Sequence, residues 1–179
     1  MACLKKLSVD ITYDCANLGF LGGTGEIDEA IVINSSDIST ISESAGVGTI
    51  TMINGKEGYV VNSVNNSVMY QEAIKANDTV PAAEDQSVVI KVMSSMDSTA
   101  YRSALTSLLK GNFRVALKSK SGNYYLAGAF CGLEASDFAT DSSTGGISTV
   151  TLKTPEASTG DMLVTLTKAA YDGLKNPKV

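Results

Sequence analysis

The chain has 179 residues with a formal net charge of −5, and 44% of its residues are hydrophobic. This apolar content is enough for a core and argues against disorder, and the length fits one domain over residues 1–179. Histidine is absent, which excludes histidine-based triads and histidine-bound zinc or haem. The acidic balance disfavours tight binding of nucleic acid, which depends on Lys and Arg, although solubility alone explains that balance equally well.

The first strand is predicted at residues 7–13, where apolar and polar side chains alternate. Asp10 and Asp14 interrupt this start, so it does not resemble a secretion signal. No apolar stretch of the sequence is long enough to cross a bilayer. We therefore expect a soluble protein that is made in a cytoplasm and has no membrane anchor.

Three polar segments predict long loops, at residues 17–25, 35–46 and 75–86. The first is rich in glycine but lacks the Gly-Lys-Ser/Thr ending of a phosphate-binding loop. All three are too long for simple turns, so we expect at least two of them to contact neighbouring subunits. The candidate contact residues in these loops are Gly22, Gly23, Gly25, Asn77, Asp78 and Pro81.

Runs of apolar and β-branched residues between these loops are typical of strands. The predicted strands lie at residues 30–33, 48–53, 59–64, 68–74 and 87–93. Asn54-Gly55 stands between two of them, and because Asn-Gly favours a tight turn, we predict that these two strands form a hairpin.

One α-helix is predicted at about residues 97–110, because apolar residues recur there at spacings of three and four. This stripe is expected to pack on a sheet face that begins directly after the helix. The predicted core residues are Tyr101, Leu105, Leu108, Leu109, Phe113, Val115 and Leu117.

The C-terminal part predicts paired strands. Residues 113–118 and 124–130 flank a Ser-Gly-Asn turn, and residues 133–138 and 147–153 flank a polar, glycine-containing connection. A last strand is predicted at residues 162–167, followed by a helical turn. About nine short strands and one flanking helix predict a mainly β protein, an antiparallel β-sandwich or barrel.

Catalytic and metal-binding patterns are not found in the sequence. The three cysteines are odd in number and have no CxxC spacing, which disfavours a disulfide framework or a zinc site. Acidic pairs such as Glu134 and Asp137 would need an aromatic-lined cleft to act as a glycosidase pair, and only 6% of the residues are aromatic. We therefore expect no enzymatic activity and no cofactor.

A resemblance to a known family covers the C-terminal half of the chain and, more loosely, its first fifteen residues. Its motifs are Leu105-x-x-Leu108-Leu109, Asn112–Leu117, Ser121–Leu126, Gly128, Gly132–Glu134, Gly145-Gly146 and Val150–Leu152, with Cys3 and Asp14-Cys15 near the start. Residues 26–95 carry no such motif. In these segments the chain resembles small structural proteins of tailed phages of gut bacteria, similar to major tail tube subunits or to neck and tail-terminator subunits.

This resemblance implies a β-sandwich with a flanking helix, assembled as hexameric rings that stack into a tube. The partners would be other copies of the chain, other tail or neck proteins, and double-stranded DNA as passing cargo. The location would be the virion tail, after synthesis in the bacterial host cytoplasm. An acidic lumen would let DNA slide, and its candidate residues are Asp10, Glu72, Glu134 and Asp137. The alternative is a monomeric β-sandwich that acts as a binding or decoration module on a virion or cell surface.

Overall fold

The computed structural model describes Asp10 and residues 27–62, 67–75, 83–92, 99–144, 146–156, 158 and 162–175. Over these residues the chain is mainly β, which confirms the predicted fold class. The strands are β1 (Ile27–Asn34), β2 (Ile38–Ser44), β3 (Val47–Met52), β4 (Tyr59–Asn62), β5 (Val68–Lys75), β6 (Ala83–Val92), β7 (Asn112–Ser119), β8 (Tyr124–Ala127), β9 (Leu133–Asp141), β10 (Ile147–Lys153) and β11 (Val164–Leu166). The helices are α2 (Thr99–Leu108) and α3 (Lys168–Asp172), with short 3-10 turns η1 (Ser35–Asp37) and η2 (Ser142–Thr144).

The sheet branches at β7. Its main path runs β2-β3-β11-β8-β7-β9-β10-β6-β5, and β1 joins β7 and β4 outside this path. Strand β1 pairs with β7 along Phe113–Ser119, so it occupies one edge of β7 over nearly its whole length. The other edge is shared: β8 pairs with Val115–Lys118, and β9 pairs with Asn112 and Phe113. The sheet is therefore open and divides into packed layers, and it is not a closed barrel.

Strands β1 and β7 form the middle layer, as the burial of β1 demonstrates. Every residue from Ala30 to Asn34 is buried, although their side chains alternate between the two faces. Side chains on one face belong to a first apolar cluster, with Ala30 and Val32 among them, and those on the other face, Ile31 and Ile33, belong to a second. Burial on both faces explains why this stretch is continuously apolar instead of alternating.

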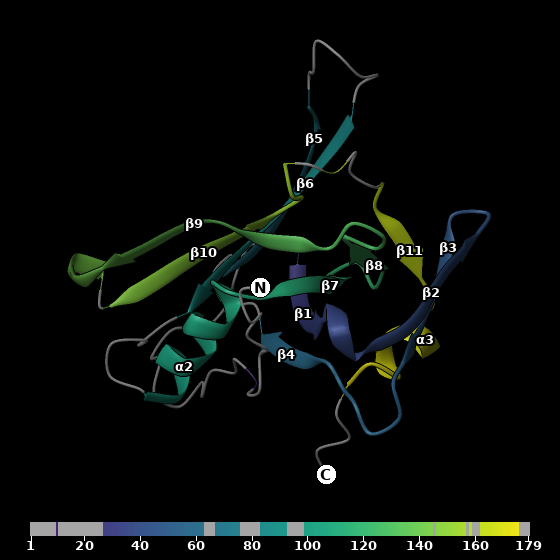
Figure 1. Ribbon diagram of the computed structural model, residues 1–179, viewed down its shortest axis with the longest axis horizontal. Coiled ribbons are helices and arrows are strands. Elements are labelled where there is room, and N and C mark those ends of the chain that lie inside the picture. The colour runs from purple at the N-terminus through teal and green to yellow at the C-terminus, as the bar shows by residue number, and fades with distance from the viewer. Residues whose placement is uncertain are drawn as a thin grey trace.

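The first cluster lies between the middle layer and the β9–β10–β6–β5 sheet, and α2 covers its open side (Figure 1). Leu108 of α2 is fully buried there, together with Phe113, Val115 and Leu117 of β7. Leu105 is 6% exposed, and Tyr101 and Leu109 are partly buried at the margin of the cluster.

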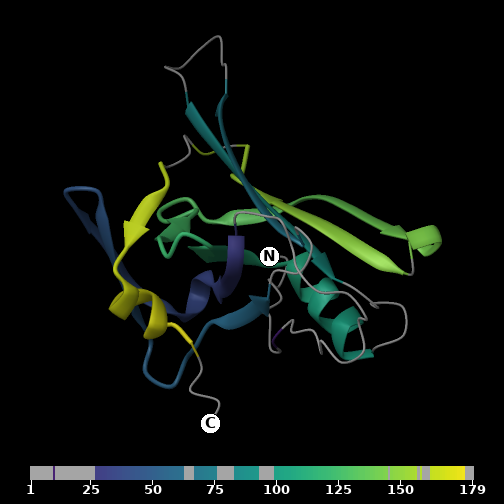
Figure 2. The same cartoon turned by 180° about the vertical axis from the view of Figure 1, so that it is seen from behind.

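The second cluster lies on the opposite face of the middle layer and is closed by β3, β11 and α3 (Figure 2). Tyr171 of α3 is fully buried and lies 5.0 Å from Tyr124 between ring centroids. Thr167 caps this short helix by accepting a hydrogen bond of 3.2 Å from the Ala170 N–H. The predicted helical turn near residue 168 is thus present, and it packs the C-terminal segment onto the core.

Three hairpins project from the layers: β2–β3, β5–β6 and β9–β10 (Figures 1 and 2). The β5–β6 and β9–β10 hairpins extend from opposite ends of one four-stranded sheet. Strand β10 pairs with β6 from Lys153 opposite Ser87 to Ser148 opposite Val92. Strand β6 therefore continues past Lys153 towards Ala83, whereas the turn of β9–β10 lies at the Val92 end.

The prediction of a loop at residues 35–46 is wrong. After the single turn η1, residues 38–44 form β2, which pairs with β3. Strand β2 was missed because its two isoleucines, Ile38 and Ile41, are three residues apart instead of two. A register shift between Ile38 and Thr40 places both isoleucines against the second cluster, so a β-bulge hides the usual alternation.

The predicted loop at residues 75–86 is wrong at both of its ends. Strand β5 continues through Lys75, and β6 begins at Ala83. The rest of the predicted loop, residues 76–82, lies outside the described residues. The hairpin extends beyond the core, and polar residues therefore occur on both of its faces and resemble a loop. Strand β9 likewise runs three residues further than predicted, to Asp141.

Asn54-Gly55 forms a turn, but the predicted hairpin is wrong. Gly55 has φ +76°, as such a turn requires. The flanking strands nevertheless diverge, because β3 pairs with β2 and β11 while β4 pairs with β1. The predicted hairpin of β7 with β8 is confirmed, and so is the pairing of β9 with β10.

Candidate assembly surface

The acidic residues predicted to line a lumen do not all lie together. Glu134 and Asp137 share the face of β9 that points away from the first cluster. They pair across the strands with Lys153 and Thr151 of β10, whereas the neighbouring Leu152 is fully buried on the opposite face. Both carboxylates are exposed, and Glu134 accepts a hydrogen bond of 2.9 Å from the Asn112 side-chain amide.

Glu72 and Asp10 lie elsewhere. Glu72 pairs across the hairpin with Gln86, which is fully buried, so it lies on the opposite face of this sheet from Asp137. Its Oε1 atom accepts hydrogen bonds from the Leu163 N–H at 3.1 Å and from Gln86 Nε2 at 3.4 Å. Asp10 is half-buried and accepts a hydrogen bond of 3.1 Å from the Val60 N–H of β4. Both carboxylates thus serve as local hydrogen-bond acceptors.

The candidate loop residues Gly22, Gly23, Gly25, Asn77, Asp78 and Pro81 lie outside the described residues.

Gln86 holds the base of the β5–β6 hairpin in place. Its backbone N–H donates to Thr154 Oγ1 at 3.0 Å, and its backbone carbonyl accepts from the Thr154 N–H at 3.0 Å. Its side chain reaches Glu72 on β5 and the Gly128 N–H in the turn between β8 and β9. The bonds to Thr154 and Gly128 lie in a buried, low-dielectric setting, so the hairpin leaves the core from a fixed base.

The four-stranded sheet ends in two strands with available edges. Among the described strands, β5 pairs with β6 alone. Strand β9 pairs with β7 only at Leu133 and Glu134, and no described strand pairs with its outer edge from Ala135 to Thr140. Unpaired strand edges are templates for pairing with another chain, so proteins normally cover or shorten them.

Exposed apolar side chains occur on the projecting hairpins. Ile74 on β5 is 75% exposed, the highest value among the large apolar residues that the structure describes, and Phe138 on β9 is 43% exposed. On the same strand as Ile74, the Tyr70 hydroxyl is buried. Burial, followed by the negative charges of Glu72 and Glu84, raises the pKa of Tyr70.

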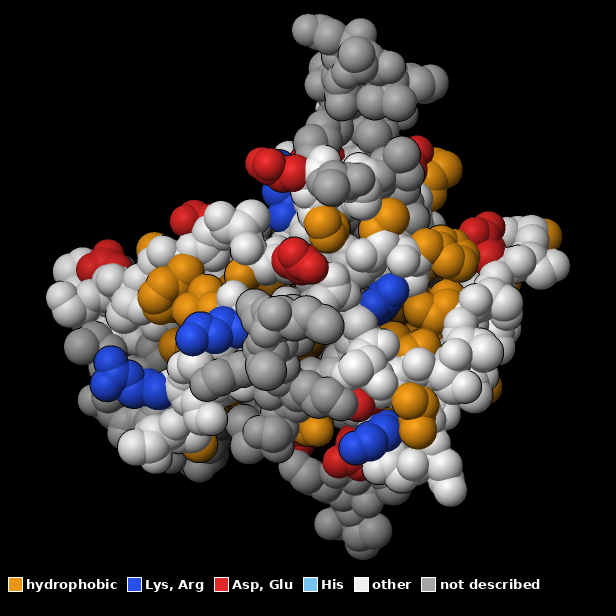
Figure 3. Space-filling view, viewed as in Figure 1, with side chains coloured by type: hydrophobic (Ala, Val, Ile, Leu, Met, Phe, Trp, Pro, Cys, Tyr) orange, Lys and Arg blue, Asp and Glu red, His pale blue; other side chains and the backbone are white. Residues whose placement is uncertain are grey.

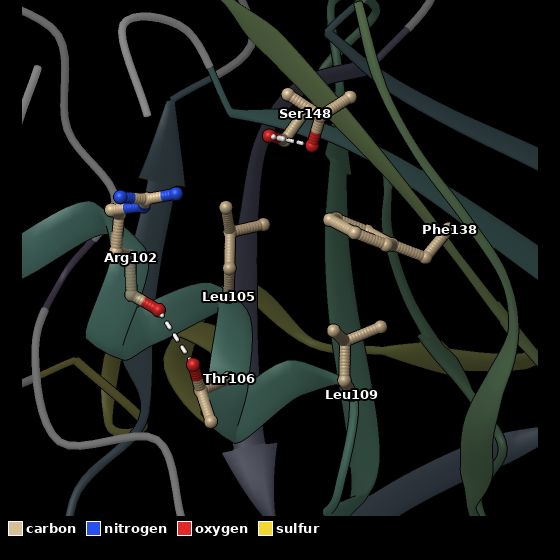
Figure 4. Close-up of a pocket in the computed structure, with 7 residues that line it drawn as sticks. Arg102, Leu105, Thr106, Leu109, Phe138 and Ser148 are labelled. Carbon is tan, nitrogen blue, oxygen red and sulfur yellow. Dashed lines mark hydrogen bonds between the residues drawn. The ribbon is translucent and has the colours of Figure 1, made fainter. Parts of the chain in front are cut away.

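Phe138 borders a groove of about 240 Å³ between α2 and the β9–β10 hairpin, here named the α2 groove (Figure 4). Leu105 of α2 and Leu109, the residue after the end of α2, point towards the Phe138 ring, and Arg102 lies at the helix side of the groove. Figure 3 shows apolar side chains gathered over this region with Lys or Arg side chains beside them. Thr140 and Ser148 complete the sheet wall and share a hydrogen bond of 2.8 Å.

A second exposed aromatic residue, Phe130, is presented by a rigid turn. Its flanking glycines, Gly128 and Gly132, have φ of +65° and +72°, values that other residues rarely adopt. The Arg114 guanidinium donates hydrogen bonds to the backbone carbonyls of Ala129 at 3.3 Å and Phe130 at 3.2 Å. Phe130 is 51% exposed, so this turn, whose backbone Arg114 ties down, presents an aromatic ring to solvent.

Sequence reasoning missed Gln86, Ile74 and the α2 groove. One signal in the sequence marks Gln86: this polar residue stands two positions before Val88, in line with the inward side chains Val88 and Ile90. Ile74 continues an apolar pattern, and nothing in the sequence marks the point where the hairpin leaves the core. Phe138 was assigned to a strand, but its distance from α2 depends on how the layers pack.

The described parts of the chain contain neither a metal-binding cluster nor a membrane-spanning helix. No three Cys, Asp or Glu side chains come together there in a way that could hold a metal ion. None of the helices there has the length and apolar character needed to cross a membrane.

No family model matches the chain, and neither a curated protein nor a solved structure shows significant similarity to it.

Proposed function

We propose that this protein is a structural virion protein, a self-assembling subunit of a phage tail tube in which hexameric rings stack into a conduit for DNA. One observation carries the proposal: a single four-stranded sheet ends in two available edges, β5 at one side and β9 at the other. A sheet with two different available edges can continue from one copy into the next, and a rotation that closes the series makes a ring.

The packing of this sheet restricts which of its faces could line a lumen. Val88 and Ile90 of β6 and Val150 and Leu152 of β10 are fully buried against the first cluster. The opposite face is therefore the one available to passing DNA.

The face available to DNA carries carboxylates and lysines in near balance. Glu134 and Asp137 are exposed on β9, and Lys153 forms an ion pair of 2.8 Å with Asp85. Lys91 adds a positive charge opposite Thr149. Because firm DNA binding requires a surplus of Lys and Arg, such a wall would let DNA pass without holding it. Glu72 and Asp10 would take no part in this wall.

The direct test is the assembly state of the purified full-length chain. Light scattering over a range of protein concentrations, combined with electron microscopy, should detect rings and stacked tubes. Isolated rings that never stack would favour the neck or tail-terminator role. A compact monomer at every concentration would contradict the proposal and favour a monomeric binding or decoration module.

A further inference from the structure

The β5–β6 hairpin and the α2 groove have complementary surfaces. The hairpin presents Ile74 directly opposite Glu84 on β6. Ile74 is 75% exposed, and Glu84 forms no ion pair with any described residue. The α2 groove offers the apolar side chains of Leu109 and Phe138, with the guanidinium of Arg102 beside them.

The Arg102 side chain is available for such a contact. It is exposed, and it makes no ion pair or side-chain hydrogen bond with the described residues; only its backbone carbonyl is engaged, by the Thr106 hydroxyl at 2.9 Å. An apolar side chain that enters an apolar groove supplies buried contact area. A negative charge beside the side chain and a positive charge beside the groove fix how the two surfaces align.

The hairpin of one molecule points away from its own groove. The pairing of β10 with β6 places the β5–β6 hairpin beyond Lys153 and the β9–β10 turn beyond Val92, at opposite ends of the sheet (Figure 1). The two surfaces can meet only between separate copies. A contact between different patches at opposite ends repeats head to tail, and it generates an open stack when the rotation between copies does not close into a ring.

We propose that the β5–β6 hairpin of one copy inserts into the α2 groove of a second copy in the next ring, with Ile74 against Leu109 and Phe138, and Glu84 paired with Arg102. This inference rests on the proposed tube function and specifies its axial contact. It is distinct from the sideways pairing of strand edges that would build each ring.

Charge reversal tests the contact in the full-length chain. Arg102→Glu and Glu84→Arg, each alone, should raise the protein concentration needed for tubes by at least about tenfold while rings persist. The double variant should restore tubes, since the pair is then reversed. Normal tubes in both single variants would overturn the proposal.

Ile74→Asp should likewise give rings without tubes. The matched control is Ile53→Asp, at an apolar position that is 43% exposed between β3 and β4, and this variant should stack normally. Thermal unfolding of both variants checks that they fold. A folded Ile74→Asp protein that has lost its rings as well would contradict an axial contact.

Cysteine cross-linking separates this inference from the proposed function. Two chains are prepared with Cys3, Cys15 and Cys131 replaced by Ser, one carrying Ile74→Cys and the other Phe138→Cys. Under mild oxidation the mixture should give covalent dimers, and each chain alone should give far fewer. Dimers without tubes would support the contact and contradict the tube function, whereas tubes without dimers would contradict the contact alone.

Discussion

The side-chain carbonyl of Gln86 accepts a hydrogen bond of 2.7 Å from the backbone N–H of Gly128, which lies 42 residues later in the chain. Both residues are buried, so neither group has access to water. The bond ties the start of the β5–β6 hairpin to the turn that leads from β8 into β9. This side chain therefore adds a direct link between the hairpin and the β8–β9 turn to the backbone bonds that hold β6 against β10 and Thr154.

Gln86→Leu should lower the free energy of unfolding by about 1–3 kcal/mol for each buried partner that it leaves without a hydrogen bond. The buried partner is the Gly128 N–H, whereas Glu72 is exposed and can turn to water. Denaturant unfolding measures the change. The control is Gln71→Leu at an exposed position of β5, which should stay within about 0.5 kcal/mol of the original protein. Equal effects of the two substitutions would contradict the structural role of Gln86.

Leu108→Ala should destabilise the protein by about 2–5 kcal/mol, because this fully buried side chain fills the first cluster between α2 and the sheet. Leu109→Ala, one residue further along, removes the same atoms from a partly buried position and should cost clearly less. Chemical denaturation of the two variants provides the comparison. A loss below about 1 kcal/mol for Leu108→Ala would mean that α2 does not pack as described.

Gly58→Ala should be strongly destabilising. A Cβ atom at this position would lie 2.3 Å from Ile31 Cγ2 and 3.1 Å from the Leu174 carbonyl oxygen, both in the interior. Overpacking of this kind typically costs about 1–3 kcal/mol. Gly55→Ala is the useful comparison, since its Cβ would meet nothing within 4 Å and the cost comes only from φ +76°. Thermal unfolding should rank Gly58→Ala as the less stable variant.

Stability should fall as the pH rises above 10. Burial, reinforced by the Glu29 carboxylate, raises the pKa of Tyr171 above its ordinary value of 10.0. The unfolded chain then loses this proton at a lower pH than the folded protein, so alkaline pH favours unfolding. Tyr171→Phe should make the decline in stability less steep. Part of the decline should remain, because the pKa of Tyr70 is raised as well. Urea unfolding at pH 8 and at pH 11 tests this, and identical pH dependence in the two proteins would contradict it.

Local patterns predicted the elements whose partners are close in sequence. The β7–β8 and β9–β10 pairs follow from alternation and turn residues, and α2 follows from the spacing of Leu105 and Leu108. The predictions failed where contacts between segments distant in sequence determine which strands pair. Strands β3 and β4 resemble a hairpin around Gly55, but each finds a stronger partner elsewhere in the fold. Strand β2 was obscured by its bulge near Thr40.

The candidate assembly surface was likewise predictable only in its local features. Sequence identifies Glu72, Glu134 and Asp137 as acidic positions on strands, but their faces follow from register, which a bulge between Thr151 and Leu152 shifts. The exposure of Ile74 depends on how far β5 extends beyond the last residues of β10. Neither property is contained in the local pattern, because both depend on contacts between distant strands.

The branching of the sheet at β7 has a consequence for how the chain is made. Strand β1 is the most continuously apolar segment of the middle layer. Its partner strand β7 comes late in the chain: Phe113, which pairs with Asn34, lies about 80 residues after it. At ordinary translation rates β1 would emerge from the ribosome several seconds before β7 can cover it. During that interval the apolar strand β1 is exposed to water and can associate with other chains. Nascent chains should therefore depend on chaperones until residue 119 has emerged, and premature termination before β7 should yield aggregates instead of partly folded subunits.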